Sequence, residues 1–221
     1  MTARHRYRLR FAKEGNLRFI GHRDLLLTIE RLLRRAELPV AMSQGFHPKP
    51  RVSYLSALPL GFSSVDEAME IVLNDELTSE DLLERLNSAS VPGLSFTRCV
   101  PLDGQTPKQK AVSFSYDVTY PPELNAVVAE RIAAFLAAES VEVVKKRNGK
   151  KVDARPVVLE LRQEGDTSLR MTLATQSGPE AGVREILGIL GLESQLFRTV
   201  FPSRIKSTIE DEIATTRQSS D

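Results

Sequence analysis

Residues 6–12 are Arg6-Tyr7-Arg8-Leu9-Arg10-Phe11-Ala12, and this alternating stretch decides how the chain begins to fold. Successive side chains of a β-strand point to opposite faces of a sheet. The stretch therefore predicts a strand that buries Tyr7, Leu9 and Phe11 and places three arginines together on the other face.

An amphipathic helix is expected next, from Arg23 to Ala36. Its apolar residues recur at three- and four-residue spacing, which puts them on one face of a helix. Pro39 sets its end. The apolar positions are Leu25, Leu26, Ile29, Leu32, Leu33 and Ala36.

Further elements complete a first half. Residues 51–57, 67–73 and 94–100 have strand character, and Thr78 or Ser79 can cap a short helix over residues 80–87. The order strand, helix, strand, strand, helix, strand is the ferredoxin-like pattern. A polar segment, residues 101–110, follows with hardly any apolar content and is interpreted as a linker.

The second half repeats the order without a visible residue-level repeat. It starts with a strand over residues 112–119 and an Ala-rich helix over residues 123–138. Asn148-Gly149 predicts a hairpin between residues 141–147 and 150–155. Strands are expected over residues 156–161, 168–174 and 196–201, with a helix over residues 180–190.

These patterns predict an α+β protein of two tandem ferredoxin-like (βαββαβ) domains with antiparallel sheets. The first domain is expected over residues 1–103, the linker over 104–111 and the second domain over 112–205. Residues 206–221 are polar and are expected to form a frayed tail.

Charge is unevenly distributed along the 221 residues, although the net charge is only +1. Residues 1–60 hold 12 Lys/Arg and 4 Asp/Glu (+8), residues 61–111 hold 4 and 9 (−5), and the remainder holds 14 and 16 (−2). A basic segment of this kind suggests an anionic partner such as nucleic acid, although solvated surface is the alternative.

Cysteine content and hydropathy limit the possible function classes. Cys99 is the only cysteine, so the chain alone can build neither a disulfide framework nor a zinc or iron–sulfur site based on several cysteines. Its apolar neighbours favour a small core residue. We expect a cytoplasmic protein, because there is no apolar run of about 18 residues and no signal-peptide core.

A loop from Gly45 to Arg51 carries the clearest binding signal. It reads Gly-Phe-His-Pro-Lys-Pro-Arg, in which prolines stiffen the backbone and basic groups favour an anion. Its aromatic ring can stack on a base or be buried as an anchor of the turn. The predicted RNA-binding surface comprises Arg18, His22, Arg23, Arg31, Arg34, Arg35, Phe46, His47, Lys49 and Arg51.

His22 and His47 also suggest a nuclease in which one imidazole removes a proton and the other donates one. Both would have to reach the same phosphate; otherwise His22 bonds to backbone, and His47 stacks on a base or holds the turn. Asp24 is expected to stabilise the first turn of the helix, and no metal site is predicted. Asp153 and Arg155 alternate on a strand, where a structural ion pair and a second-domain site are both open.

Residues 15–61, from Gly15-Asn16-Leu17-Arg18-Phe19 through the Gly45–Arg51 loop to Leu58-Pro59-Leu60-Gly61, resemble a bacterial family of radical-SAM-linked proteins. The resemblance extends to Val152-Asp153-Ala154-Arg155-Pro156. Members occur beside a radical SAM enzyme or fused to one. The chain is more distantly similar to RAMP-type RNA-binding proteins, which carry paired ferredoxin-like folds.

The resemblance implies a separately encoded radical SAM enzyme that holds the iron–sulfur cluster and S-adenosylmethionine, while this chain has no cofactor of its own. The leading hypothesis is an RNA-binding accessory protein, not itself an enzyme, that presents tRNA or rRNA for modification. The alternatives are a metal-independent endoribonuclease that uses His22 and His47, and a protein-interaction scaffold without nucleic acid. In the scaffold, residues 1–60 and 61–111 would bind subunits of opposite charge.

Overall fold

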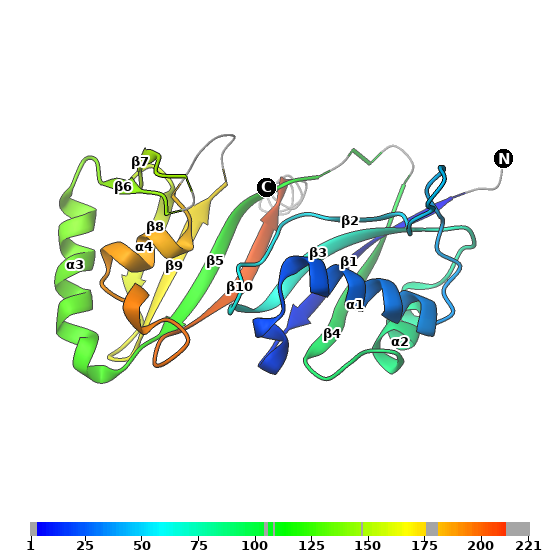
Figure 1. Ribbon diagram of the computed structural model, residues 1–221, viewed down its shortest axis with the longest axis horizontal. Coiled ribbons are helices and arrows are strands. Elements are labelled where there is room, and N and C mark those ends of the chain that lie inside the picture. The colour runs from blue at the N-terminus through cyan, green and yellow to red at the C-terminus, as the bar shows by residue number, and fades with distance from the viewer. Residues whose placement is uncertain (1–3, 104–105, 108, 147, 176–180, 211–221) are drawn as a thin grey trace, which may run out of the picture. The chain divides into compact units, whose positions relative to one another are not determined.

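The computed structural model describes residues 4–103, 106–107, 109–146, 148–175 and 181–210 (Figure 1). The chain divides into two compact units, Met1–Lys110 and Ala111–Asp221. Each unit combines helices with an antiparallel sheet, so the expected α+β class is confirmed.

The described residues of the first unit form four strands and two α-helices. Its sheet has the order β4-β1-β3-β2, and every neighbouring pair is antiparallel. A 3₁₀ turn, η1, joins β1 to α1. The elements are β1 (His5–Lys13), η1 (Gly15–Phe19), α1 (His22–Arg35), β2 (Val52–Tyr54), β3 (Ser63–Leu73), α2 (Ser79–Ser88) and β4 (Leu94–Leu102).

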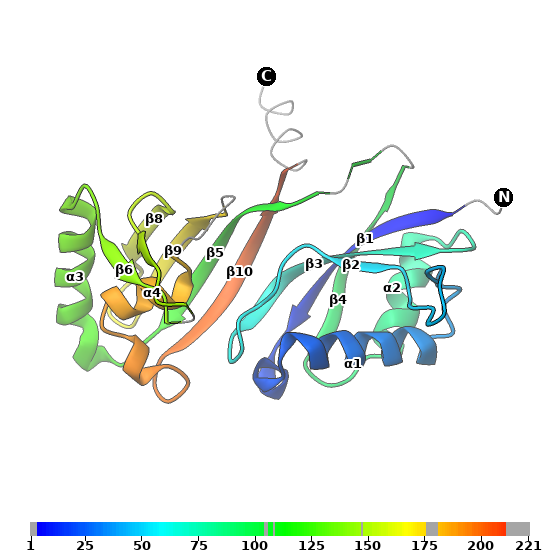
Figure 2. The same ribbon diagram turned by 45° about the horizontal axis from the view of Figure 1, so that its top comes forward.

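Both helices cover one face of this sheet (Figures 1 and 2). Tyr7, Leu9 and Phe11 of β1 are buried there, as the alternation predicts. The buried leucines of α1 and α2 pack in the same core. Thr78 caps α2, because its hydroxyl accepts a hydrogen bond of 3.1 Å from the Asp81 amide.

The opposite face of β1 holds a buried ionic network. Arg8 is only 7% exposed, and Arg10 is equally buried. Glu70 of β3 lies opposite Arg8 and accepts hydrogen bonds from Arg6 and Arg8, while Asp66 binds Arg10 at 3.1 Å. The acidic segment, residues 61–111, thus neutralises part of the basic segment, residues 1–60, inside one sheet. A charge count by segment does not reveal this pairing.

The second unit has the sheet order β10-β5-β9-β8, again antiparallel throughout. A separate hairpin, β6–β7, follows α3. The elements are β5 (Ala111–Thr119), η2 (Pro122–Leu124), α3 (Asn125–Ala137), β6 (Glu142–Val144), β7 (Lys151–Asp153), β8 (Val158–Gln163), β9 (Ser168–Ala174), α4 (Val183–Ile189), η3 (Glu193–Gln195) and β10 (Phe201–Ile209).

The last strand lies later than the sequence pattern predicts. Residues 196–200 form a tight turn, in which three successive amides, from Arg198 to Val200, donate to the Gln195 carbonyl oxygen. The strand β10 then runs to Ile209, through residues that we expected in the tail. A register shift between Arg204 and Lys206 breaks its alternation, which is why period two does not identify it.

Candidate nucleic-acid interface

The solvent side of α1 carries a basic stripe. Arg23, Leu27, Arg31 and Arg34 follow one another at spacings of four, four and three residues, and all are exposed. Arg23 and Arg34 are separated by about 16 Å along the axis at 1.5 Å per residue. None of the three arginines forms a salt bridge with a residue that the structure describes.

An arm projects between α1 and β2. We define the arm as residues 42–50, which a bridge between Met42 and Pro50 closes at its base. Within it, the Ser43 amide donates to the Lys49 carbonyl oxygen at 2.8 Å, and the Lys49 amide donates to the Ser43 hydroxyl at 2.9 Å. The backbone of Ala41 and Arg51 fastens the base to Val72 of β3. The arm is therefore a braced hairpin rather than a loose loop.

Phe46 at the tip of the arm is 103% exposed, so it is not a buried anchor. Gly45 beside it has φ +139°, a conformation that glycine adopts without strain. His47, Lys49 and Arg51 are also exposed. The stripe, the arm and Arg51 at the base of the arm together hold five exposed cations that form no salt bridge within the described part of the chain: Arg23, Arg31, Arg34, Lys49 and Arg51.

The two histidines lie near opposite ends of α1. His22 is the first residue of this helix, and its ring packs edge-on against Tyr54 at 5.7 Å between centroids. His47 lies in the arm that follows the other end, and 14 helical residues span about 21 Å (Figure 2). Burial and the Glu30 carboxylate raise the pKa of Tyr54, so this phenol stays protonated at neutral pH.

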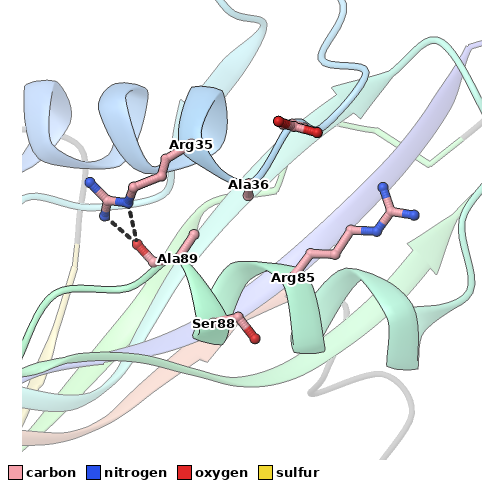
Figure 3. Close-up of a pocket in the computed structure, with 6 residues that line it drawn as sticks. Arg35, Ala36, Arg85, Ser88 and Ala89 are labelled. Carbon is pink, nitrogen blue, oxygen red and sulfur yellow. Dashed lines mark hydrogen bonds between the residues drawn. The ribbon is translucent and has the colours of Figure 1, made fainter.

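Arg18 and Arg35 lie outside the stripe. The Arg18 guanidinium stacks 4.7 Å over the Phe19 ring within η1. Arg35 donates to the carbonyl oxygen of Ala89 at the end of α2, beside a hollow of about 490 Å³ (Figure 3). Figure 3 shows Arg35 and Arg85 pointing away from each other, so they do not converge on one ligand.

Asp153 and Arg155 hold the base of the β6–β7 hairpin. One Asp153 carboxylate oxygen accepts from the amides of Val141 and Arg155, each at 2.9 Å. These bonds lower the pKa of Asp153. The Arg155 guanidinium lies 5.7 Å over the Phe135 ring of α3. Both side chains therefore position the hairpin.

Sequence reasoning missed the cations at the tip of this hairpin, Lys145, Lys146, Lys150 and Lys151, together with Arg147, which lies outside the described residues. Counting charge over the whole of residues 112–221 averaged the tip with acidic surroundings. Counting charge over a shorter window would have revealed the positive charge of the tip.

Other chemistry in the described residues is limited. No group of three or more His, Cys, Asp or Glu among them is placed to hold a metal ion. Cys99 is buried, and burial raises the pKa of its thiol. No helix in the described part of the chain is long and apolar enough to cross a membrane.

Comparison with models of protein families identifies the family of this chain. A model of uncharacterized proteins conserved in bacteria (DUF2344) matches residues 6–183. The chain belongs to this family. The match runs from β1 to the first residue of α4, so it includes the basic stripe, the arm and the β6–β7 hairpin. No curated protein matches the chain.

Proposed function

We propose that this chain binds RNA through the stripe of α1 and the arm, and that it presents tRNA or rRNA to a separately encoded radical SAM enzyme in the cytoplasm. The observation that carries the proposal is that α1 and the arm that follows it carry five exposed cations and the exposed ring of Phe46. Arginine can grip phosphate bidentately, and an exposed ring can stack on an unpaired base.

The arginines of β1 do not compete for this role. Arg6, Arg8 and Arg10 are held by Glu70 and Asp66 within the sheet. A phosphate would have to displace these carboxylates and enter a buried network. The stripe and the arm require no such exchange.

The strand orders support a ferredoxin-like fold for each unit. The first unit has strands in the order fourth, first, third, second, and the second unit has the same order once the β6–β7 hairpin is set aside. Two such domains in tandem are the arrangement that the RAMP-type resemblance implies. We propose this arrangement as the scaffold for RNA binding.

The radical SAM partner rests on the resemblance of residues 15–61 and 152–156 to radical-SAM-linked proteins. In this division of labour the partner supplies the cluster and S-adenosylmethionine, and the chain supplies substrate. Copurification from the native cell, followed by sequencing of crosslinked RNA, tests the pairing. Recovery of the chain with neither enzyme nor RNA would reject it.

Salt dependence tests RNA binding itself. We expect the affinity for bulk tRNA, measured by fluorescence anisotropy, to fall steeply between about 50 and 200 mM KCl, because phosphate contacts release counterions. Arg31→Gln with Arg34→Gln should make the log–log slope shallower by about two, near one for each lost cation. The matched control is Arg85→Gln with Arg98→Gln, exposed arginines of the same unit outside the stripe.

The separation of His22 and His47 along α1 weighs against the two-histidine nuclease. If bulk RNA were cleaved without metal by the wild type, and His22→Ala abolished cleavage, the accessory role would have to be replaced by the enzymatic one. A flat salt dependence together with a salt-sensitive protein complex would instead favour the scaffold.

A further inference from the structure

We propose that the β6–β7 hairpin, residues 141–155, is a second contact site for the phosphate backbone of the bound RNA. This inference rests on the function proposed above and extends it to the second unit. The hairpin would add affinity that does not depend on base sequence.

Charge singles out this hairpin within its unit. Residues 141–155 hold six Lys/Arg and two Asp/Glu, a net charge of +4. The rest of residues 112–221 holds eight and fourteen, a net charge of −6. The hairpin is thus a positively charged element in an otherwise acidic unit.

The tip places like charges opposite each other. The Lys145 amide donates to the Lys150 carbonyl oxygen at 2.9 Å, which continues the register from Val144 and Lys151. The strand pairing thus brings cationic residues together at the tip, and clustered positive charge favours a polyanion as the partner.

Carboxylates near the tip hold its lysines only loosely. Lys146 binds Glu193 at 2.7 Å and Lys151 binds Glu142 at 2.7 Å, but the two lysine side chains are 81% and 67% exposed. Exposed ion pairs contribute little in water, so either lysine can exchange its carboxylate for a phosphate.

The hairpin is held in shape before it binds. Asn148 and Gly149 form the turn, in which Gly149 has φ +67° and its amide donates to the Lys145 carbonyl oxygen at 2.8 Å. Asp153 ties the two strands at the base, and Arg155 fixes the base to α3. A braced basic tip loses little conformational freedom on binding.

No aromatic residue occurs in residues 141–155, so the hairpin offers no ring for stacking on a base. Lysines act as point charges, which suits a phosphate backbone. Because both contact sites belong to one chain, an RNA long enough to reach both should bind more tightly than a short one.

The test compares three proteins on bulk tRNA by fluorescence anisotropy at about 50 to 200 mM KCl. Lys150→Gln with Lys151→Gln removes two cations of the tip. Arg198→Gln with Lys206→Gln removes two exposed cations of the same unit outside the hairpin. We expect the slope of log affinity against log salt to be shallower by about two for the hairpin variant than for the wild type. The control should keep the wild-type slope.

A short oligoribonucleotide that reaches only the stripe and the arm should bind the hairpin variant as tightly as the wild type. Circular dichroism verifies folding of each protein. A hairpin variant with the same slope as the control would overturn the inference while leaving the proposed function intact if Arg31→Gln with Arg34→Gln still weakens binding. A flat slope for the wild type would instead remove the proposed function and the inference together.

Discussion

Glu70→Gln should strongly destabilise the first unit. Glu70 binds Arg8 through Oε1 at 3.1 Å and Arg6 through Oε2 at 3.0 Å. Glutamine keeps the size of the side chain but deprives the guanidinium of Arg8, 7% exposed, of its carboxylate. Breaking a buried pair costs about 3 to 5 kcal/mol. We expect about 3 kcal/mol, because the amide oxygen of glutamine still accepts one hydrogen bond.

Urea denaturation followed by far-ultraviolet circular dichroism measures this loss of unfolding free energy. A loss of about 3 kcal/mol corresponds to a melting temperature lower by roughly 12 °C or more for a domain of this size. Glu142→Gln is the control, since its partner Lys151 and Glu142 itself are mostly exposed, and it should leave the transition unchanged. If Glu70→Gln unfolded at the same urea concentration as Glu142→Gln, the buried network would not hold the sheet together.

Three further changes test other parts of the structure. Phe46→Ala should leave the urea midpoint unchanged, because the ring is fully exposed. The same change should weaken RNA binding about tenfold, because stacking on a base is lost. An unchanged affinity for RNA would exclude the ring from the interface. Thr78→Ala should cost about 1 kcal/mol of unfolding free energy, because α2 loses its cap, whereas Thr78→Ser should retain stability. Cys99 should react slowly with a thiol reagent, because burial raises its pKa and lowers the thiolate fraction at a given pH. Its rate should rise with pH at more alkaline values than for a free thiol and should increase in urea; equal rates in folded and unfolded protein would refute its burial.

Local patterns predicted much of the first unit. The alternation over residues 6–12 identified β1 and its buried face, and the spacing of leucines identified α1 to within one residue of its start. These predictions succeed because a strand or helix with one covered face repeats its apolar residues at a fixed period.

The fate of the arginines of β1 could not be predicted in the same way. Their partners Asp66 and Glu70 lie 56 to 64 positions further along the chain, and only the pairing of β1 with β3 brings them together. Charge counted along the sequence therefore overstated the basic surface of residues 1–60.

Two features of the second unit were missed for different reasons. The strand β10 contains a register shift, so its buried residues Arg204 and Ser207 do not alternate. The hairpin over residues 141–155 was recognised from its Asn148-Gly149 turn, but its charge was hidden by the acidic residues of the surrounding unit.

Crosslinking tests the central claim most directly. Bulk tRNA is irradiated with the wild-type protein, and the crosslinked peptides are identified by mass spectrometry. RNA binding through the stripe and the arm predicts adducts within residues 22–51, including the exposed ring of Phe46. If none of these residues carried an adduct, whether RNA was attached elsewhere or not at all, the result would contradict the account.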